Sequence, residues 1–259
     1  MEELTTRGLV IHETQIGDYD KILTVLTPTA GKITISGKGV KSLKSRHMAA
    51  TQLFSYSAFQ LHRRGNYYYI DDSEMIENFF GIRGDLLKLS LASYICDVAN
   101  DVTVENEDET DMMRLILNTL YAIDKGLKDL ELIRGAFQLR LASVAGFMPD
   151  LSGCRNCHTR SAPRLTLDIL DGNLICDSCK KHIDHDYMDE NGEFLRPIVI
   201  LDSSLTAAMQ YVIYAKPERF LSFSIDDEAI DAFASCCEKY LLHHLERGFY
   251  SLDFYKSLL

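Results

Sequence analysis

Short runs of β-branched, aromatic and other apolar residues, separated by turn-forming residues, occupy the first part of the chain. Two runs lie at residues 8–12 and 21–27, and polar and apolar residues alternate through residues 32–36. Two aromatic-rich runs follow at residues 54–61 and 67–70. Such runs predict β-strands, and alternation predicts strands that are buried on one face. Five short strands within about seventy residues, with little helical pattern between them, predict a small closed barrel of the OB-fold type.

From about Ser73 the apolar spacing changes to that of amphipathic helices, with apolar residues recurring every three or four positions. Gly146, followed by Pro149, predicts the end of the third helix. We expect these apolar stripes to form helical core, and Cys96, Cys236 and Cys237 to be packed thiols within it. The five predicted helices cover residues 86–98, 112–123, 133–144, 205–213 and 230–245.

Two Cys-x-x-Cys pairs stand on either side of a predicted hairpin at residues 165–175. Cys154 and Cys157 form the first pair, and Cys176 and Cys179 form the second. Four thiolates fill a tetrahedral shell, so this spacing predicts one structural zinc ion with no open position for water or substrate. Zinc binding at such a site contributes about 10 kcal/mol or more, enough to fold a segment that has little apolar core.

Three other interpretations of the cysteines fit the sequence less well. Residues 154–158 spell the haem-attachment pattern, but this would leave the second pair unexplained. A dithiol redox site needs only one pair, placed at a helix start after a strand. A zinc deaminase needs an H-x-E ahead of its pair, whereas residues 244–246 follow both pairs. We therefore interpret His158 as a bystander, and expect a solvated loop rather than a second metal site at His182, Asp184, His185 and Asp186.

The charge of the chain is unevenly distributed. The 259 residues carry 27 basic and 38 acidic side chains, a net charge of −11. Residues 21–70 hold eight lysine and arginine residues and no aspartate or glutamate, so this segment carries +8 and the rest of the chain −19. A purely basic segment within an acidic chain favours contact with a polyanion over a solvated face that has no partner.

Aromatic residues are interleaved with the basic ones, as in proteins that bind single-stranded nucleic acid. We expect the glycine-flanked loop at residues 37–48, with Lys38, Lys41, Lys44 and Arg46, to contact phosphates. Arg63 and Arg64 stand beside three tyrosines at 67–69. At least half of the aromatic residues must belong to the barrel core, which leaves one or two to stack on bases. Because no groove-reading helix is evident, we expect binding that is largely independent of sequence.

No motif supports catalysis. The phosphate-loop patterns and the G-x-S-x-G nucleophile pattern are absent, and no nucleophile with a partnered base can be identified. The acidic start of the chain lacks the order of a signal peptide, and the uncharged runs at 48–61 and 203–215 are too short and too polar to span a bilayer. Seven cysteines in this context favour a reducing compartment. We therefore expect a cytoplasmic protein that is not an enzyme and does not bind membranes.

The order of several short runs along the chain is more specific than any one of them. They lie at residues 6–11, 18–27, 31–32, 37–41, 137–141, 145–150 and 254–259, with the cysteine pairs between the last two. Together they resemble the bacterial recombination mediator family RecO over essentially the whole chain. The resemblance implies an α+β multidomain protein, in which an OB-fold is joined to a helical domain that carries a zinc ribbon.

We divide the chain into four segments on this basis. They are an OB-fold domain at 1–79, a first helical part at 80–149, a four-cysteine zinc ribbon at 150–186, and a second helical part at 187–259. We expect the two helical parts to pack together, because neither alone has enough apolar area for a comfortable core.

The resemblance also implies a non-enzymatic role in the recombinational repair of DNA. Members of the family bind single- and double-stranded DNA, anneal complementary strands and associate with RecR. They also engage the acidic C-terminal tail of the single-stranded-DNA-binding protein and help RecA to replace that protein on DNA. Some members lack the four cysteines, which agrees with a structural ion.

Two sets of site residues follow from the resemblance. By position, Lys32, Lys38, Lys41, Lys44 and Arg46 match the family's basic barrel surface. Arg134, Arg140 and Lys216 are candidates for binding the acidic tail. The alternative functions are a protein-interaction adaptor built on the barrel and ribbon, and an RNA-binding protein, since stacking and phosphate contacts do not themselves distinguish the two sugars.

Overall fold

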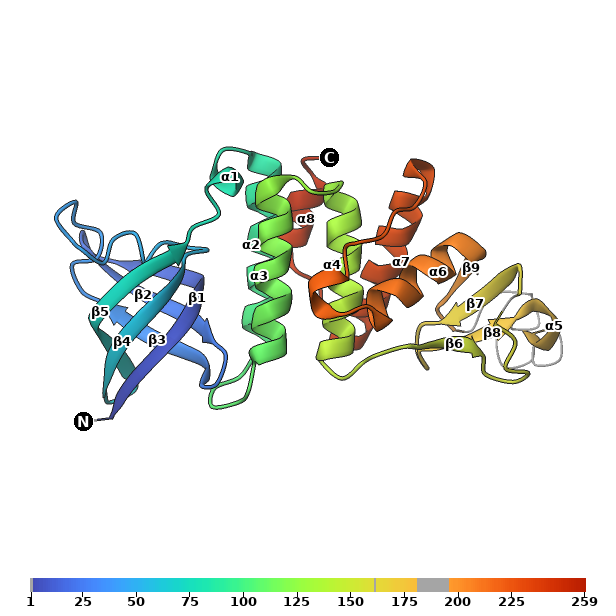
Figure 1. The fold of residues 1–259 in the computed structure, drawn as a ribbon, viewed down its shortest axis with the longest axis horizontal. Coiled ribbons are helices and arrows are strands. Elements are labelled where there is room, and N and C mark those ends of the chain that lie inside the picture. Colours follow the sequence, from blue (N-terminus) through green and yellow to red (C-terminus); the bar gives the residue numbers. More distant parts are fainter. Residues whose placement is uncertain (1, 161, 181–195) are drawn as a thin grey trace. The chain divides into compact units, whose positions relative to one another are not determined.

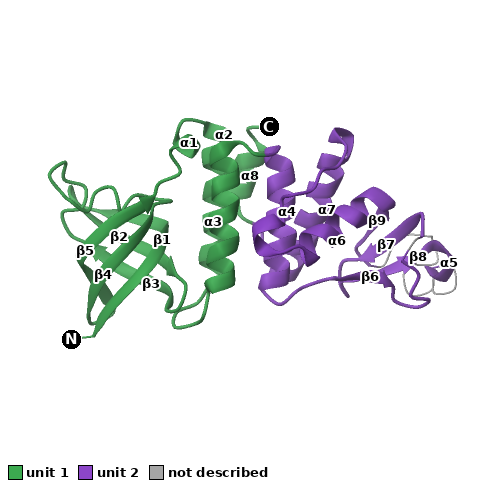
Figure 2. Cartoon of the chain, viewed as in Figure 1, with its two compact units in different colours: residues 1–127, 249–259 green, residues 128–248 purple. Residues whose placement is uncertain are grey.

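The computed structural model describes residues 2–160, 162–180 and 196–259. The chain forms two compact units, one made of residues 1–127 and 249–259 and the other of residues 128–248 (Figure 2). The second unit is therefore an insertion into the first along the sequence. The four predicted segments divide the chain differently, and they stay a prediction.

The first unit begins with a closed five-stranded barrel (Figure 1). Neighbouring strands pair in the order β1-β2-β3-β5-β4, and the barrel closes through the antiparallel pairing of β1 with β4. β3 and β5 meet in a short parallel pair, in which Ile35 lies opposite Tyr68 and Ser36 opposite Tyr69. The predicted five-stranded barrel is confirmed. Its strands are β1 (Glu3–Ile16), β2 (Asp20–Thr27), β3 (Gly31–Gly37), β4 (Tyr56–Arg64) and β5 (Tyr67–Glu77).

Alternate residues of the strands fill the barrel interior, as the period of two requires. This core comprises Val10, Leu23, Val25, Ile33, Ile35, Phe59 and Leu61. β5 continues seven residues past the predicted end at Ile70, and its second half pairs with β4 as far as Glu77 opposite Tyr56. That half is acidic and largely exposed, so it carries no apolar alternation from which a strand could be predicted.

Helices complete the first unit. The carboxylate of Asp85 caps α2 by accepting hydrogen bonds from the N–H groups of Leu87 and Lys88. α8 packs on α2, where the rings of Tyr94 and Phe249 meet edge to face at 5.9 Å. α1 and α8 span at most two turns, too short to show a helical period, and neither was predicted. The helices of this unit are α1 (Phe80–Arg83), α2 (Leu86–Val102), α3 (Thr110–Lys125) and α8 (Tyr250–Lys256).

The start of β3 is attached to the segment that joins α2 and α3. Gly31 has a φ of +63°, and a Cβ atom there would lie 2.2 Å from the carbonyl oxygen of Val104. The Lys32 N–H donates to this carbonyl at 2.9 Å, and Lys32 Nζ donates to the carbonyl oxygen of Asn100 at 2.6 Å. Only glycine fits such a close approach at positive φ.

The second unit combines a helical core with a small sheet. α4 and α7 pack closely at Gly135, where a Cβ atom would lie 2.9 Å from the Cα atom of Ala234. The Asp129 carboxylate caps α4. The core helices are α4 (Leu130–Val144), α6 (Ser203–Tyr214) and α7 (Asp227–Leu245), with a 3-10 turn, η2 (Pro217–Arg219), between the last two. Among the residues described, no helix has both the length and the apolar character needed to cross a membrane.

The sheet of the second unit has the strand order β6-β8-β7-β9. β7 and β8 form the predicted antiparallel hairpin, with Leu165 opposite Cys176, which confirms that prediction. β9 pairs with the outer edge of β7 and was not predicted. The elements are β6 (Asp150–Cys154), β7 (Arg164–Asp168), β8 (Asn173–Cys176), the single turn α5 (Asp177–Lys180) and β9 (Ile198–Asp202).

The cysteines on the helices are core residues, as predicted. Cys96, Cys236 and Cys237 are all buried. Burial raises the pKa of each thiol, to about 12 for Cys236, because the thiolate would be poorly solvated there. They are packed thiols of the helical core.

Candidate metal centre and nucleic-acid interface

The four predicted metal ligands converge at one end of the small sheet. Cys154 ends β6 and Cys176 ends β8, and these two strands pair in parallel, so their ends lie together. Cys157 follows in a turn and Cys179 lies on α5. The four sulfur atoms all lie within 4.8 Å of one another, and Sγ of Cys157 is 3.7 Å from Sγ of Cys176.

Backbone N–H groups point at the sulfurs. The Cys176 N–H donates to Sγ of Cys154 at 3.4 Å. Burial raises the pKa of Cys154, but backbone hydrogen bonds from Cys157, Cys176 and Asn156 outweigh this and lower it to about 6. Asn156 lowers the pKa of Cys179, but hydrogen bonds with the other three cysteines and burial outweigh this and raise it to about 12. The thiolate is the form that binds metals, and a bound cation would favour it at all four positions. His158 is not part of the cluster, and the residues 182–186 of the predicted loop lie outside the described residues.

Four cysteine sulfurs at this spacing can hold one ion in a tetrahedral shell. Three of the four side chains are buried and Cys157 is exposed. A filled shell offers no position for a substrate, so an ion here would connect strand, turn and helix rather than perform chemistry.

The predicted nucleic-acid-binding residues of the barrel lie mainly in two segments, the loop after β3 and the β4–β5 hairpin. The pairing of β3 with β5 brings these two segments together. Lys38 follows β3, and its Nζ atom lies 5.7 Å from the centre of the Tyr69 ring. Arg63 is the last but one residue of β4, and its guanidinium lies 5.7 Å from the centre of the Tyr68 ring. Arg46 joins the same region, since its Nη2 donates to the carbonyl oxygen of Asp71 at 2.8 Å.

These basic side chains differ in how freely their charge can reach a phosphate group of a bound nucleic acid. Lys38, Lys44 and Arg64 are exposed. Arg46 and Arg63 are exposed too, but each faces a carboxylate, Asp72 at 3.8 Å and Glu2 at 3.4 Å respectively. Such exposed ion pairs are weak and open readily to a competing anion.

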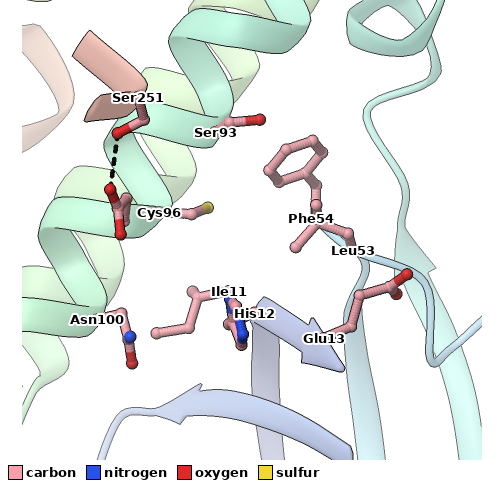
Figure 3. A pocket seen from close by; sticks show the side chains of 10 residues that line it. Ile11, His12, Glu13, Leu53, Phe54, Ser93, Cys96, Asn100 and Ser251 are labelled. Carbon is pink, nitrogen blue, oxygen red and sulfur yellow. Dashed lines mark hydrogen bonds between the residues drawn. The ribbon is translucent and has the colours of Figure 1, made fainter. Parts of the chain in front are cut away.

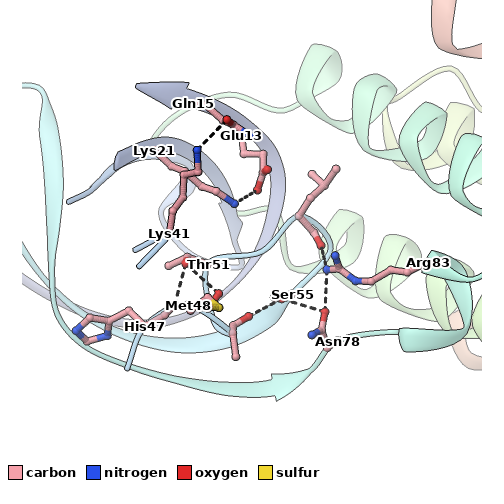
Figure 4. Close-up of polar contacts among 12 residues, drawn as sticks. Glu13, Gln15, Lys21, Lys41, His47, Met48, Thr51, Ser55, Asn78 and Arg83 are labelled. Carbon is pink, nitrogen blue, oxygen red and sulfur yellow. Dashed lines mark hydrogen bonds and ion pairs between the residues drawn. The ribbon is translucent and has the colours of Figure 1, made fainter. Parts of the chain in front are cut away.

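Lys32 and Lys41 are half-buried, and the ammonium group of each donates a hydrogen bond to another segment of the chain. Lys41 Nζ donates to Oε1 of Gln15 at 2.9 Å (Figure 4). Lys32 lies at the start of β3, the opposite end from Lys38, and its Nζ is bonded to the carbonyl oxygen of Asn100 on α2. Sequence position alone grouped Lys32 with the loop lysines. The structure does not bring it together with them.

Hydrogen bonds order the long segment between β3 and β4. Its beginning is tied to the β1–β2 hairpin, where the carboxylate of Asp20 accepts from the Gly39 N–H at 2.7 Å. At its end, Oγ of Ser55 donates to Oδ1 of Asn78, which also accepts from Arg83 (Figure 4). The segment is irregular in backbone conformation, yet its position on the barrel is defined.

The aromatic residues divide between core and surface. Phe54 and Phe59 are both 1% exposed and belong to the core, and Tyr68 packs against the barrel core cluster. Tyr67 is 41% exposed, so its ring is available for stacking.

The structure also reveals an acidic border that sequence reasoning missed. The second half of β5 carries Asp71, Asp72 and Glu74, all exposed, directly after the basic segment. Asp71 lies 2.8 Å from Nδ1 of His62, and Asp72 faces Arg46. These carboxylates limit the positive surface on one side. The abrupt change of charge after Ile70 was the available signal.

A pocket of about 320 Å³ lies in the first unit (Figure 3). Its apolar lining includes Ile11, Leu53 and Phe54, with the Cys96 thiol beside them. Its polar lining includes the carboxylates of Glu13 and Asp97, and Oγ of Ser251 donates to Asp97 at 2.7 Å. Glu13 is ion-paired with Lys21, and the described residues that line the pocket include no lysine or arginine that could hold a phosphate, so nothing assigns the pocket to the candidate nucleic-acid surface.

The three candidates for binding an acidic tail lie in different settings. Arg134 is 3% exposed and ion-paired with Glu131 and Glu238, so its charge serves the α4–α7 pair. Arg140 donates to the carbonyl oxygens of Val212 and Ile213 at the end of α6. Lys216, just after α6, is exposed. The role of these residues in binding a partner stays a prediction.

Comparisons with known proteins cover nearly the whole chain. The family model described as "Recombination protein O N terminal" matches residues 1–79, and "Recombination protein O C terminal" matches residues 83–253. A protein of Acetivibrio thermocellus named DNA repair protein RecO is 30% identical over 259 residues, which cover 100% of this chain and 98% of that one.

Two further relatives carry the same name. The protein of Alkaliphilus metalliredigens is 28% identical, over 98% of this chain and 99% of its own. That of a Thermoanaerobacter species is 29% identical, over 100% and 99%. With both halves matched in order and a relative aligned along its full length, the chain belongs to the RecO family.

Proposed function

We propose that the protein is a DNA-binding recombination mediator in DNA repair. It binds and anneals single-stranded DNA, and together with RecR it assists the loading of RecA onto DNA coated with the single-stranded-DNA-binding protein. The observation that carries this proposal is the family membership, since relatives that match the chain from end to end are named DNA repair proteins.

The barrel is the proposed DNA-binding part. Support comes from the exposed cations Lys38, Lys44 and Arg64, and from the exposed ring of Tyr67. Cations hold the phosphate chain without regard to sequence, and aromatic rings stack on any base. That combination suits a protein that must act on strands of arbitrary sequence.

One structural zinc ion is the proposed occupant of the four-cysteine cluster. Four thiolate ligands at these distances fit tetrahedral zinc. When bound, the ion would fix β6, β8 and α5 to one another. It would take no part in DNA chemistry, and we propose that the protein is not an enzyme.

The test uses the double variant Lys38→Glu/Lys44→Glu. Both side chains are exposed, so folding should be unaffected. Lys41 is left unchanged because it is bonded to Gln15. The matched control is Arg219→Glu/Lys239→Glu, which makes the same change of charge at exposed positions of the second unit. The measurement is annealing of complementary strands already coated with the single-stranded-DNA-binding protein.

We expect the barrel variant to lose most of its annealing and DNA affinity at an unchanged melting temperature, while the control behaves as wild type. Annealing at the wild-type rate in the barrel variant would refute the assignment of the surface. An equal loss in both variants would mean that net charge, not the barrel, is responsible. Tighter binding of RNA than of DNA in a competition with oligomers of one sequence would favour the RNA-binding alternative.

A further inference from the structure

Apolar side chains are exposed at the same end of the barrel as the loop lysines. Leu43 is 93% exposed, Tyr19 62% and Ile16 50%. Single exposed apolar residues are common on protein surfaces, but a group of them beside a cationic loop is not explained by folding. These three side chains, defined here as the apolar tip, are not used by the phosphate contacts proposed above.

The backbone presents Leu43 at the apex of a turn. The Ser45 N–H donates to the carbonyl oxygen of Ser42 at 2.8 Å, which places Leu43 and Lys44 at the two central positions. The preceding turn is closed by a 3.1 Å bond from the Ser42 N–H to the carbonyl oxygen of Gly39. Val40, between them, is 2% exposed and anchors the loop in the barrel. Leu43 is therefore projected into solvent by an anchored loop.

Hydrogen bonds connect this loop to the hairpin that carries the rest of the apolar tip. The Lys41 N–H donates to the carbonyl oxygen of Tyr19 at 3.1 Å, and Lys41 Nζ reaches Gln15 on β1. Ile16 ends β1, and Tyr19 precedes β2. The two loops thus present apolar groups and lysines on one surface.

We infer that the apolar tip, led by Leu43, contacts the faces of unpaired bases while the neighbouring lysines hold the flanking phosphates. A single strand offers both chemistries, an apolar base and a phosphate, at each nucleotide. In a duplex the bases are stacked and paired, so an apolar side chain can reach them only by unstacking a step. The tip would therefore make the barrel favour unpaired strands. This inference rests on the proposed DNA-binding function.

The test is a cycle that combines one protein variant with one change in the ligand. Leu43→Ser removes the apolar group and leaves every lysine in place. The ligand change is from a single-stranded DNA oligonucleotide to an abasic one of equal length, which keeps the phosphates and lacks the bases. Leu127→Ser, at an exposed leucine of the same unit, is the matched control. Leu43→Phe tests whether a larger apolar group restores or improves binding.

We expect Leu43→Ser to weaken binding of the normal strand about fivefold to thirtyfold, the lower part of the range for an aromatic ring stacked on one base, because leucine offers a smaller contact. On the abasic strand, Leu43→Ser and wild type should bind equally. The dependence of affinity on salt should not change, because no cation is lost. Leu43→Phe and Leu127→Ser should bind the normal strand at least as well as wild type.

An equal effect of Leu43→Ser on both strands, or no effect on either, would overturn the inference and leave the proposed function standing. Loss of binding to phosphatidylserine vesicles, with DNA binding unchanged, would assign the apolar tip to a membrane surface and overturn it too. Failure of the wild-type protein to bind DNA would refute the proposed function and, with it, this inference.

Discussion

At the scale of single residues, His244 on α7 is held in an unusual environment. Its ring lies 4.4 Å from the ring of Tyr240 and 5.4 Å from that of Phe147, measured between centres. Its Nε2 atom is buried and, among the described residues, has no hydrogen-bond partner. Burial and the neighbouring His243 lower the pKa of His244, although a backbone hydrogen bond with Ile169 acts in the opposite direction.

This lowered pKa predicts that part of the stability depends on pH. His244 is neutral in the folded chain at a pH where the unfolded chain, with a pKa near 6.5, already takes up a proton. Its contribution is therefore complete above about pH 6.5 and is lost as the pH falls through the folded pKa. We expect the urea midpoint of His244→Gln to fall less than that of wild type between about pH 7.5 and 5.

The comparison between variants separates this effect from loss of metal at low pH, which both proteins share. His12→Gln, at an exposed histidine of the first unit, is the control and should follow the wild-type curve. Parallel curves for wild type and His244→Gln would show that the His244 ring does not govern this pH dependence.

At the scale of elements, the helix pair α4–α7 depends on a small residue. A methyl group at Gly135 would meet the Cα atom of Ala234 at 2.9 Å and the ring of Phe233 at the same distance. Overpacking of this kind costs about 1–3 kcal/mol, whereas the better helix propensity of alanine returns about 1 kcal/mol. We expect Gly135→Ala to lower the thermal midpoint and Gly135→Val to lower it further. Gly84→Ala, where nothing lies within 4 Å, should change it little.

The ribbon is the element that should depend on metal. We expect about one zinc per chain in the purified protein, and much less in Cys176→Ser, by elemental analysis. Chelation should speed hydrogen exchange in β6–β8 and α5 and leave the barrel strands unchanged. Cys96→Ser, at a buried cysteine outside the cluster, should keep its zinc. Zinc below half an equivalent in wild type, with four freely titratable thiols, would contradict the assignment.

The elements also show how far the sequence could predict the structure. The long amphipathic helices and the barrel strands were predictable because burial imposes a period on them. The acidic half of β5 was missed because it is exposed and shows no apolar alternation. β9 was missed because it lies at the edge of its sheet, and it is its pairing with β7 that identifies it as a strand. The cysteine cluster was evident from spacing alone. The separate roles of Lys32 and Lys38 were not, since they depend on which ends of β3 meet α2 and β5.

At the scale of the whole molecule, the charge is segregated. The basic segment at 21–70 is confined to the barrel and its loops, while the remaining chain carries −19. An acidic remainder discourages nonspecific binding of DNA elsewhere, so the barrel surface is the part that should control how affinity depends on salt.

This segregation predicts a measurable salt dependence. If the five exposed cations contact phosphates of a single strand, log K should fall with log salt at a slope of about −3.5. The five are Lys38, Lys44, Arg46, Arg63 and Arg64. Fluorescence anisotropy with a labelled oligonucleotide in roughly 50 to 400 mM NaCl gives the slope. Lys44→Gln should reduce its magnitude by about 0.7 and Lys239→Gln should not change it. A slope near zero in wild type would contradict the electrostatic assignment.

The return of α8 to the first unit has a consequence for how the protein is made. Residues 249–259 complete that unit, yet a ribosome must first synthesise residues 128–248. At roughly 5–20 residues per second, the nascent chain waits on the order of ten seconds with the α2 surface that receives Phe249, Leu252 and Tyr255 uncovered. Chaperones that recognise apolar surface should engage it during that interval. A message truncated just after residue 248 would yield an intact second unit attached to an unfinished first one.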